Sequence, residues 1–194
     1  MVVCVGHKNK KGQTVNDAIR ESRQSVLDFF RIDEKVIHRV RALKPRILSW
    51  AGEAMKTAFS HVEMEPEVAD YFLLQENMRA LQASMLSQAD RLLSAQFDEA
   101  YYQAIDEIGA RHAKLDYPAF VYTAGYANLL SAIQSVAAKK RNALRPEDMD
   151  ALIRVSLFDL ENTTEAFYRH RMSRTAALDA DAAKVRELLA KRAS

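Results

Sequence analysis

Residues that end helices are few and widely spaced in this chain, and they limit its fold more than any other feature. The 194 residues include five Gly and four Pro, while Ala, Leu, Glu, Lys, Arg and Gln are common. Strand-like alternation of apolar and polar residues is almost absent. A chain of this length suits one domain with a substantial core. The sequence therefore predicts an all-α fold of about seven or eight helices.

Pro and Gly also place the expected helices along the chain. Residues 1–14 are basic and contain two Gly, which predicts a loose N-terminal arm. Asp33 is an expected N-cap, and Pro45 is expected to separate two helices. The expected helices cover about residues 16–30, 34–43, 47–62, 67–74, 78–92, 97–113 and 118–139, with one more from 146 onward.

Charge and cysteine content exclude several classes of protein. The formal net charge of +2 produces no strong field that would attract nucleic acid. Cys4 is the only cysteine, which excludes an internal disulfide framework. No apolar run approaches the roughly 20 residues of a membrane span, and the N-terminus lacks a signal-peptide hydrophobic region. We therefore expect a cytoplasmic protein without a membrane span or a nucleic-acid partner.

One helical face ends in a histidine. Phe97, Tyr101, Ile105, Ile108 and His112 follow one another at steps of four, four, three and four residues, which is the period of a buried helical face. The imidazole at its end has two interpretations. It is either a satisfied core histidine or a ligand to an apolar cofactor that lies on this face, as a proximal histidine holds haem iron.

The residues around His112 carry a family resemblance. Residues 95–101 read Ala-Gln-Phe-Asp-Glu-Ala-Tyr, residues 108–112 read Ile-Gly-Ala-Arg-His, and Tyr122 follows His112 by ten positions, with Tyr126 one turn later. This pattern resembles the globin domains of globin-coupled sensors, a bacterial haem-sensor family. The resemblance covers roughly residues 33–135 and continues more weakly through the last helix.

The resemblance implies an all-α globin fold with an extra N-terminal helix and an extended C-terminal helix. It divides the chain into an N-terminal arm with a pre-globin helix (1–31), a sensor globin domain (32–172) and a helical extension toward an output module (173–194). It further implies haem b as the cofactor and His112 as the proximal ligand of the iron.

The resemblance also suggests which residues line the cofactor pocket. In addition to His112, the expected pocket residues are Phe59, Asn77, Leu81, Met85, Ile108, Tyr122 and Tyr126. Tyr122 is expected near the imidazole. The family usually has a tyrosine seven residues before the following proline, where it hydrogen-bonds to the gas ligand. Counting back from Pro66 reaches Phe59, which cannot donate a hydrogen bond. We therefore expect an apolar distal pocket. The other interpretation is that these aromatic and apolar residues are ordinary core residues.

The last expected helix carries a second apolar pattern. Its residues repeat at steps of four and three, which predicts pairing between helices of two chains; the expected seam residues are Ile153, Leu157, Leu160 and Phe167. The pattern continues to about residue 188, weakened by charges. The resemblance implies a homodimer whose last helix leads to an output domain. The alternative is an amphipathic last globin helix with an incidental tail.

Two functions follow from these observations. The first is a haem-based sensor that detects a diatomic gas (dioxygen first, or carbon monoxide or nitric oxide) or the haem redox state. It would signal through the dimer helices to a C-terminal output domain or a separate signalling partner. The alternative is a haem-free, globin-like regulatory or dimerisation module. The sequence contains no Glu-x-x-His pair, no His-Glu-x-x-His motif and no glycine-rich phosphate loop. We therefore expect no catalytic residues and no enzyme.

Overall fold

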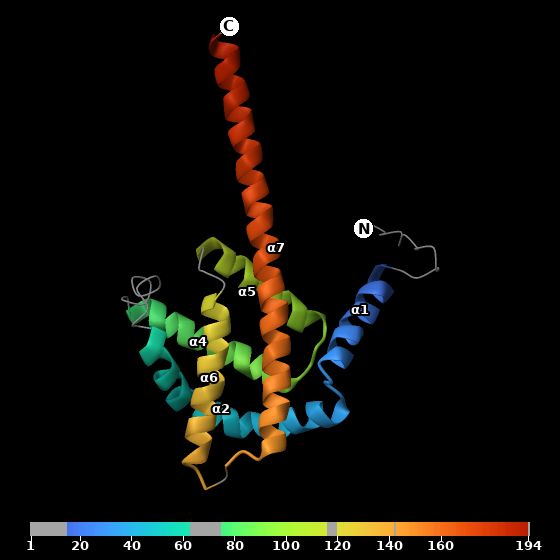
Figure 1. Cartoon of the computed structure of the whole chain (residues 1–194), viewed down its shortest axis with the longest axis vertical. Coiled ribbons are helices and arrows are strands. Elements are labelled where there is room, and N and C mark those ends of the chain that lie inside the picture. The colour runs from blue at the N-terminus through green and yellow to red at the C-terminus, as the bar shows by residue number, and fades with distance from the viewer. Residues whose placement is uncertain (1–14, 63–74, 116–119, 142, 194) are drawn as a thin grey trace, which may run out of the picture.

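The computed structural model describes residues 15–62, 75–115, 120–141 and 143–193, and these residues form helices joined by short loops (Figure 1). No strand occurs among them, so the all-α prediction is confirmed. The helices are α1 (Val15–Phe29), α2 (Glu34–Val62), α4 (Gln75–Ser94), α5 (Glu99–Leu115), α6 (Phe120–Ala138) and α7 (Pro146–Ala193). The short helix expected at 67–74 lies outside the described residues. None of the helices described is both long and apolar enough to cross a membrane.

Helix α2 corrects the expected break at Pro45. The helix begins after Asp33, whose carboxylate accepts a hydrogen bond from the Val36 N–H at 2.9 Å, so the predicted N-cap is confirmed. It then continues through Pro45 to its end. A proline in a helix removes one N–H donor and crowds one carbonyl, which can bend the helix rather than end it. Leu43 and Ile47 are both buried, so apolar burial on both sides of Pro45 favours continuation. Figure 1 shows α2 changing direction along its length.

Helix α7 runs along the long direction of the molecule (Figure 1). Its first part packs against α5, α6 and α2. An aromatic group in the core joins Phe158 of α7 to Phe97, with ring centroids 5.0 Å apart, and to Tyr101. From Met172 to Arg186 every side chain of α7 is exposed, and Figure 1 shows this part extending away from the other helices. The helix expected from residue 146 onward is confirmed, and it continues without interruption to Ala193.

Gly109 allows α5 and α7 to pack closely. A Cβ atom at this position would lie 2.6 Å from the Cβ of Ala166 and 2.8 Å from the backbone nitrogen of Phe167. Both distances are shorter than van der Waals contact allows, and the second involves backbone that cannot move aside cheaply. Glycine at 109 therefore sets the spacing of α5, the helix that carries His112, on α7.

Candidate functional site

Helix α5 presents the predicted stripe to the interior. Asp98 caps the helix, since its carboxylate accepts the N–H of Tyr101 at 3.0 Å. Within the stripe, Tyr101 is 1% exposed and Ile108 is 6% exposed, whereas Phe97 and His112, at the two ends, are half-buried. The apolar face predicted from the spacing is confirmed, and it places His112 where the face meets the edge of the core.

His112 has the properties of a nitrogen ligand. Burial, reinforced by the nearby positive charge of Arg111, lowers the pKa of its imidazole to about 4. The ring is therefore neutral at pH 7, which is the form that binds a metal. Across the residues that the structure describes, no group of three or more His, Cys, Asp or Glu side chains could hold a metal ion. Haem iron needs no such group, since its porphyrin supplies the other nitrogens and one axial imidazole suffices. His112 thus fits a haem ligand.

The end of α5 that carries His112 is held by α7. Ala113 is buried in a small apolar group with Phe167 and the half-buried Leu160. The guanidinium of Arg174 donates hydrogen bonds to the carbonyl of Ala113 at 3.1 Å and that of Lys114 at 3.4 Å. These carbonyls belong to the last turn of α5, where helical partners are missing. Arg174 therefore caps α5 directly after His112.

A further group of polar contacts joins the same two helices. Asp106 of α5 contacts Arg169 of α7 at 2.6 Å and His170 at 3.0 Å. The hydrogen bond from Arg169, together with that from His170, holds the pKa of Asp106 below its usual range. Helix α5 is thus fixed to α7 at several levels along its length.

The predicted pocket residues come from four helices. Met85 of α4 is half-buried and packs against Ala51 and Met55 of α2, while Ile108 of α5 is buried. Tyr126 of α6 is half-buried. Four predicted residues belong to described helices, but their side chains lie outside the part of the chain described: Phe59, Asn77, Leu81 and Tyr122.

A buried polar cluster, which the sequence reading missed, lies among these helices. Asp159 of α7 accepts hydrogen bonds from the hydroxyl of Tyr101 at 2.7 Å, the amide of Gln88 at 2.7 Å and the hydroxyl of Tyr126. Burial raises the pKa of Asp159, and the three donors oppose this effect. We call these four residues the Asp159 cluster. The sequence signal was an acidic residue within the buried face that contains Val155 and Ala166 of α7.

The predicted dimer seam needs a correction at Phe167. Ile153 and Leu157 are exposed, at 41% and 44%, and remain candidates for an interface. Phe167 is fully buried and cannot face a second chain. A straight α-helix drifts by about 20° per heptad, so two heptads after Ile153 the pattern has turned about 40° toward the core. The exposed apolar positions later in the helix are instead Tyr168 and Met172.

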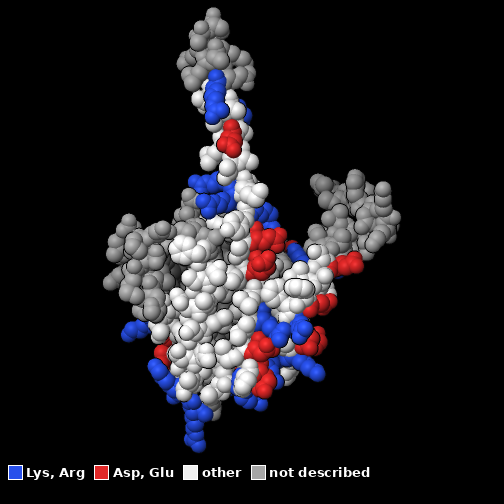
Figure 2. Space-filling view, in the orientation of Figure 1, with Lys and Arg blue, Asp and Glu red and all other residues white. Residues whose placement is uncertain are grey.

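Helix α6 adds an uncharged surface beside this face of α7. The helix contains no Lys, Arg, Asp or Glu from its first residue to its last. Figure 2 shows few charged side chains over α6, in contrast to the opposite edge of the molecule near α1. An uncharged helix beside exposed apolar residues of α7 is the kind of surface that a protein partner covers.

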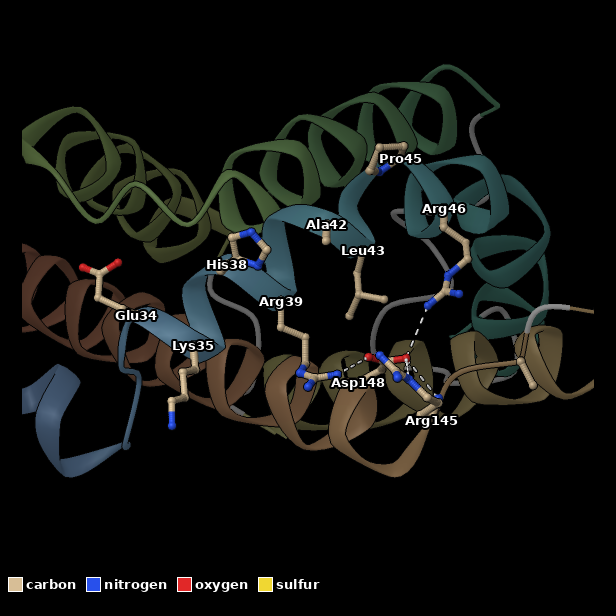
Figure 3. Close-up of a pocket in the computed structure, with 11 residues that line it drawn as sticks. Glu34, Lys35, His38, Arg39, Ala42, Leu43, Pro45, Arg46, Arg145 and Asp148 are labelled. Atoms are coloured by element: carbon tan, nitrogen blue, oxygen red, sulfur yellow. Dashed lines mark hydrogen bonds and ion pairs between the residues drawn. The ribbon is translucent and has the colours of Figure 1, made fainter.

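A separate groove, with a volume of about 960 Å³, lies between the first half of α2 and the start of α7 (Figure 3). None of the predicted site residues lines it. At its base, Asp148 contacts Arg39 at 2.8 Å and Arg46 at 3.4 Å, and accepts the backbone N–H of Arg145 at 3.1 Å. Burial acts to raise the pKa of Asp148, but Arg145 and Arg39 hold it below its usual range. Three arginines thus contact one buried carboxylate, and these contacts join the start of α7 to α2.

Comparisons with known proteins agree with this fold. A family model described as Protoglobin matches residues 20–172. The globin domain of a Geobacter sulfurreducens globin-coupled sensor superimposes with a TM-score of 0.64 at 16% identity, covering 75% of this chain and 97% of that domain. The globin domain of E. coli DosC in its ferric form gives a TM-score of 0.59 at 16% identity, covering 78% of this chain and 99% of that domain. No curated protein matches the chain by sequence. At these identities the structural likeness shows the fold, and the family match extends over most of the chain.

Proposed function

The chain belongs to the protoglobin family, and from this premise we propose that it binds haem b through His112 and responds to a diatomic gas. The resemblance to globin-coupled sensors inferred from the sequence is confirmed. Haem, when bound, supplies an iron atom at which a small gas molecule can bind. The observation that carries the proposal is the neutral, half-buried imidazole of His112 at the end of the apolar face of α5.

The residues around His112 support a haem site in two ways. Ile108 and Ile105 provide apolar surface on the same face of α5, which suits a porphyrin ring. The capping of Ala113 by Arg174 holds the last turn of α5, so the histidine is positioned by a fixed helix end. The distal residues expected from the sequence, Phe59 and Leu81, would complete an apolar pocket, and they remain a prediction.

A homodimer is part of the proposal. Ile153 and Leu157 of α7 are exposed, Tyr168 and Met172 continue the same side of the helix, and α6 next to them is uncharged. A second copy of the chain would cover these residues and hold the two α7 helices together. The exposed stretch of α7 from residue 173 to 186 would then lead toward an output domain or a signalling partner.

A haem titration of the purified chain, followed by absorption spectroscopy, tests the function. We expect a Soret band that saturates at one haem per chain, and a shift of that band when carbon monoxide is added to the reduced protein. His38→Ala is the matched control, because His38 lines the groove on α2 and should leave the titration unchanged. A chain that folds but gives no saturable Soret band would contradict the proposal and favour the haem-free dimerisation module.

A further inference from the structure

Asp159 is an acidic residue at the centre of the domain. It is 1% exposed, and the nearby positive charge of Arg91 acts on it without forming a salt bridge in the described part of the chain. Its hydrogen-bond partners are the neutral side chains of Tyr101, Gln88 and Tyr126. Burying a carboxyl group costs free energy, and an apolar residue at the same position is often as stabilising or more so. What Asp159 adds to the core is a set of specific hydrogen bonds.

The Asp159 cluster brings together four helices. Gln88 comes from α4, Tyr101 from α5 and Tyr126 from α6, and all three converge on one side chain of α7. Gln88 also donates to the hydroxyl of Tyr126 at 2.8 Å, so the three donors form a connected network. In a low-dielectric interior such a network favours one relative placement of its helices over neighbouring placements.

The three donors lie on the helix faces that carry the proposed haem site. Tyr101 is on the stripe of His112, eleven residues earlier in α5. On α4, Gln88 follows Met85 by three residues, and on α6, Tyr126 follows Tyr122 by four. Residues three or four apart share one side of a helix. The faces of α4, α5 and α6 that would surround the haem therefore all meet α7 at Asp159.

We infer that Asp159 is a positioning residue that fixes the walls of the haem site on α7, so that a change at the site is passed to the C-terminal extension. This inference rests on the proposed haem function. Asp159 is thirteen residues before Met172, where α7 becomes exposed, which is about 20 Å along the helix axis. The carboxyl group would act through Gln88, Tyr101 and Tyr126.

The test uses the full chain loaded with haem and compares Asp159→Asn with the unaltered protein. The side chain keeps its size, but its NH2 group replaces one of the two oxygens that accept hydrogen bonds. We expect haem to bind at one per chain in both proteins. The midpoint potential of the haem should shift in the variant, because the helices that would surround the haem lose an acceptor that fixes them on α7. An unchanged potential would overturn the role of Asp159 in fixing the walls of the haem site.

The second readout is the link to α7. The rate of trypsin cleavage at Lys184 and Arg186, both exposed in the extension, is measured with and without carbon monoxide on the reduced protein. In the unaltered chain the two rates should differ at least twofold, and in Asp159→Asn their ratio should fall to near one. Haem binding with the same ratio in both proteins would overturn this inference alone. Failure of the unaltered chain to bind haem would overturn the proposed function and this inference with it.

Two tyrosine variants keep the test decisive if Asp159→Asn fails to fold. Tyr126→Phe removes one donor from the cluster and retains the ring, whereas Tyr102→Phe removes a hydroxyl from α5 outside the cluster. Tyr102 packs under the guanidinium of Arg23 instead. We expect Tyr126→Phe to reduce the carbon monoxide effect on cleavage and Tyr102→Phe to leave it intact. Equal behaviour of the two variants would contradict the role of the cluster.

Discussion

At the scale of single residues, Gly109 determines how closely α5 approaches α7. A methyl group there would overlap Ala166 and the backbone of Phe167, so the two helices would have to separate. We expect Gly109→Ala to lower the free energy of unfolding by about 1–3 kcal/mol. Chemical denaturation measured by circular dichroism gives this value.

Gly52 is the matched control for Gly109. It also lies inside a helix, but a Cβ atom there would have no neighbour within 4 Å. Because alanine restricts the unfolded chain more than glycine does, Gly52→Ala should raise the free energy of unfolding by about 0.5–1 kcal/mol. Two glycine substitutions with the same sign and size would show that the contact with Ala166 is not the cause.

His112 gives the stability of the haem-free chain a pH dependence. The pKa of its imidazole is about 4 in the folded chain, against 6.5 as the ordinary value for the unfolded chain. Between these pH values the unfolded chain binds more protons, so the free energy of unfolding falls as the pH falls. We expect a loss of about 2 kcal/mol from His112 between pH 7 and pH 5.

His112→Gln isolates this contribution, because glutamine does not titrate. Urea unfolding of both haem-free proteins at pH 7 and pH 5 gives the difference between the two losses. The carboxylates of the chain contribute equally to both proteins and cancel. An equal loss in the variant would mean that His112 is not desolvated in the folded chain.

At the scale of helices, the C-terminal end of α5 depends on a side chain from α7. Arg174 supplies hydrogen bonds to two carbonyls of the last turn, at Ala113 and Lys114. Hydrogen bonds to a charged donor contribute about 1.5–3 kcal/mol when buried, and this one is partly exposed. We expect Arg174→Ala to lower the free energy of unfolding by about 1 kcal/mol and to speed hydrogen exchange in the last turn of α5.

Arg186→Ala provides the control for charge. Arg186 lies on the exposed extension of the same helix, far along the chain from the end of α5. Its substitution removes the same charge and should change neither the free energy of unfolding nor the exchange of α5 amides. Faster exchange in both variants would indicate a general charge effect rather than a cap.

The helices also show which structural features could be predicted from sequence patterns and which could not. The continuity of α7 follows from the lack of Gly and Pro after Pro146, and the cap at Asp33 follows from local chemistry. The continuation of α2 through Pro45 does not, because it depends on apolar burial contributed by other helices on both sides of the proline. Local rules describe helix ends well, and tertiary packing decides whether an interrupted helix bends or stops.

The candidate site also contains one part that the sequence predicts and one part that it does not. The stripe ending at His112 could be predicted, because burial on one helix follows the helical period. The Asp159 cluster could not, since its members are far apart in the sequence and only the packing of four helices brings them together. The sequence placed Phe167 on the exposed seam, but its side chain is buried. A straight α-helix rotates relative to a seven-residue repeat, and over two heptads this rotation moves a residue to another face.

At the scale of the whole molecule, α7 provides both the core and the proposed interface. Leu157 is exposed whereas Phe167 is fully buried, although both are large apolar residues of this helix. We expect Leu157→Glu to convert a dimer to a monomer in sedimentation experiments without changing the helix content measured by circular dichroism. Phe167→Glu should unfold the domain, since it places an unpaired charge in the core. A dimer that persists in Leu157→Glu would place the interface elsewhere.

The central claim is that His112 is the protein ligand of haem iron, and imidazole rescue of His112→Gly tests it most directly. The variant removes the ring and leaves space for a small molecule. The absorption spectrum of the reduced, haem-loaded chain is recorded for both proteins, with and without added imidazole. We predict that the variant loses the spectrum of the unaltered protein and regains it when imidazole is added. A variant whose spectrum matches the unaltered protein without imidazole would contradict the claim.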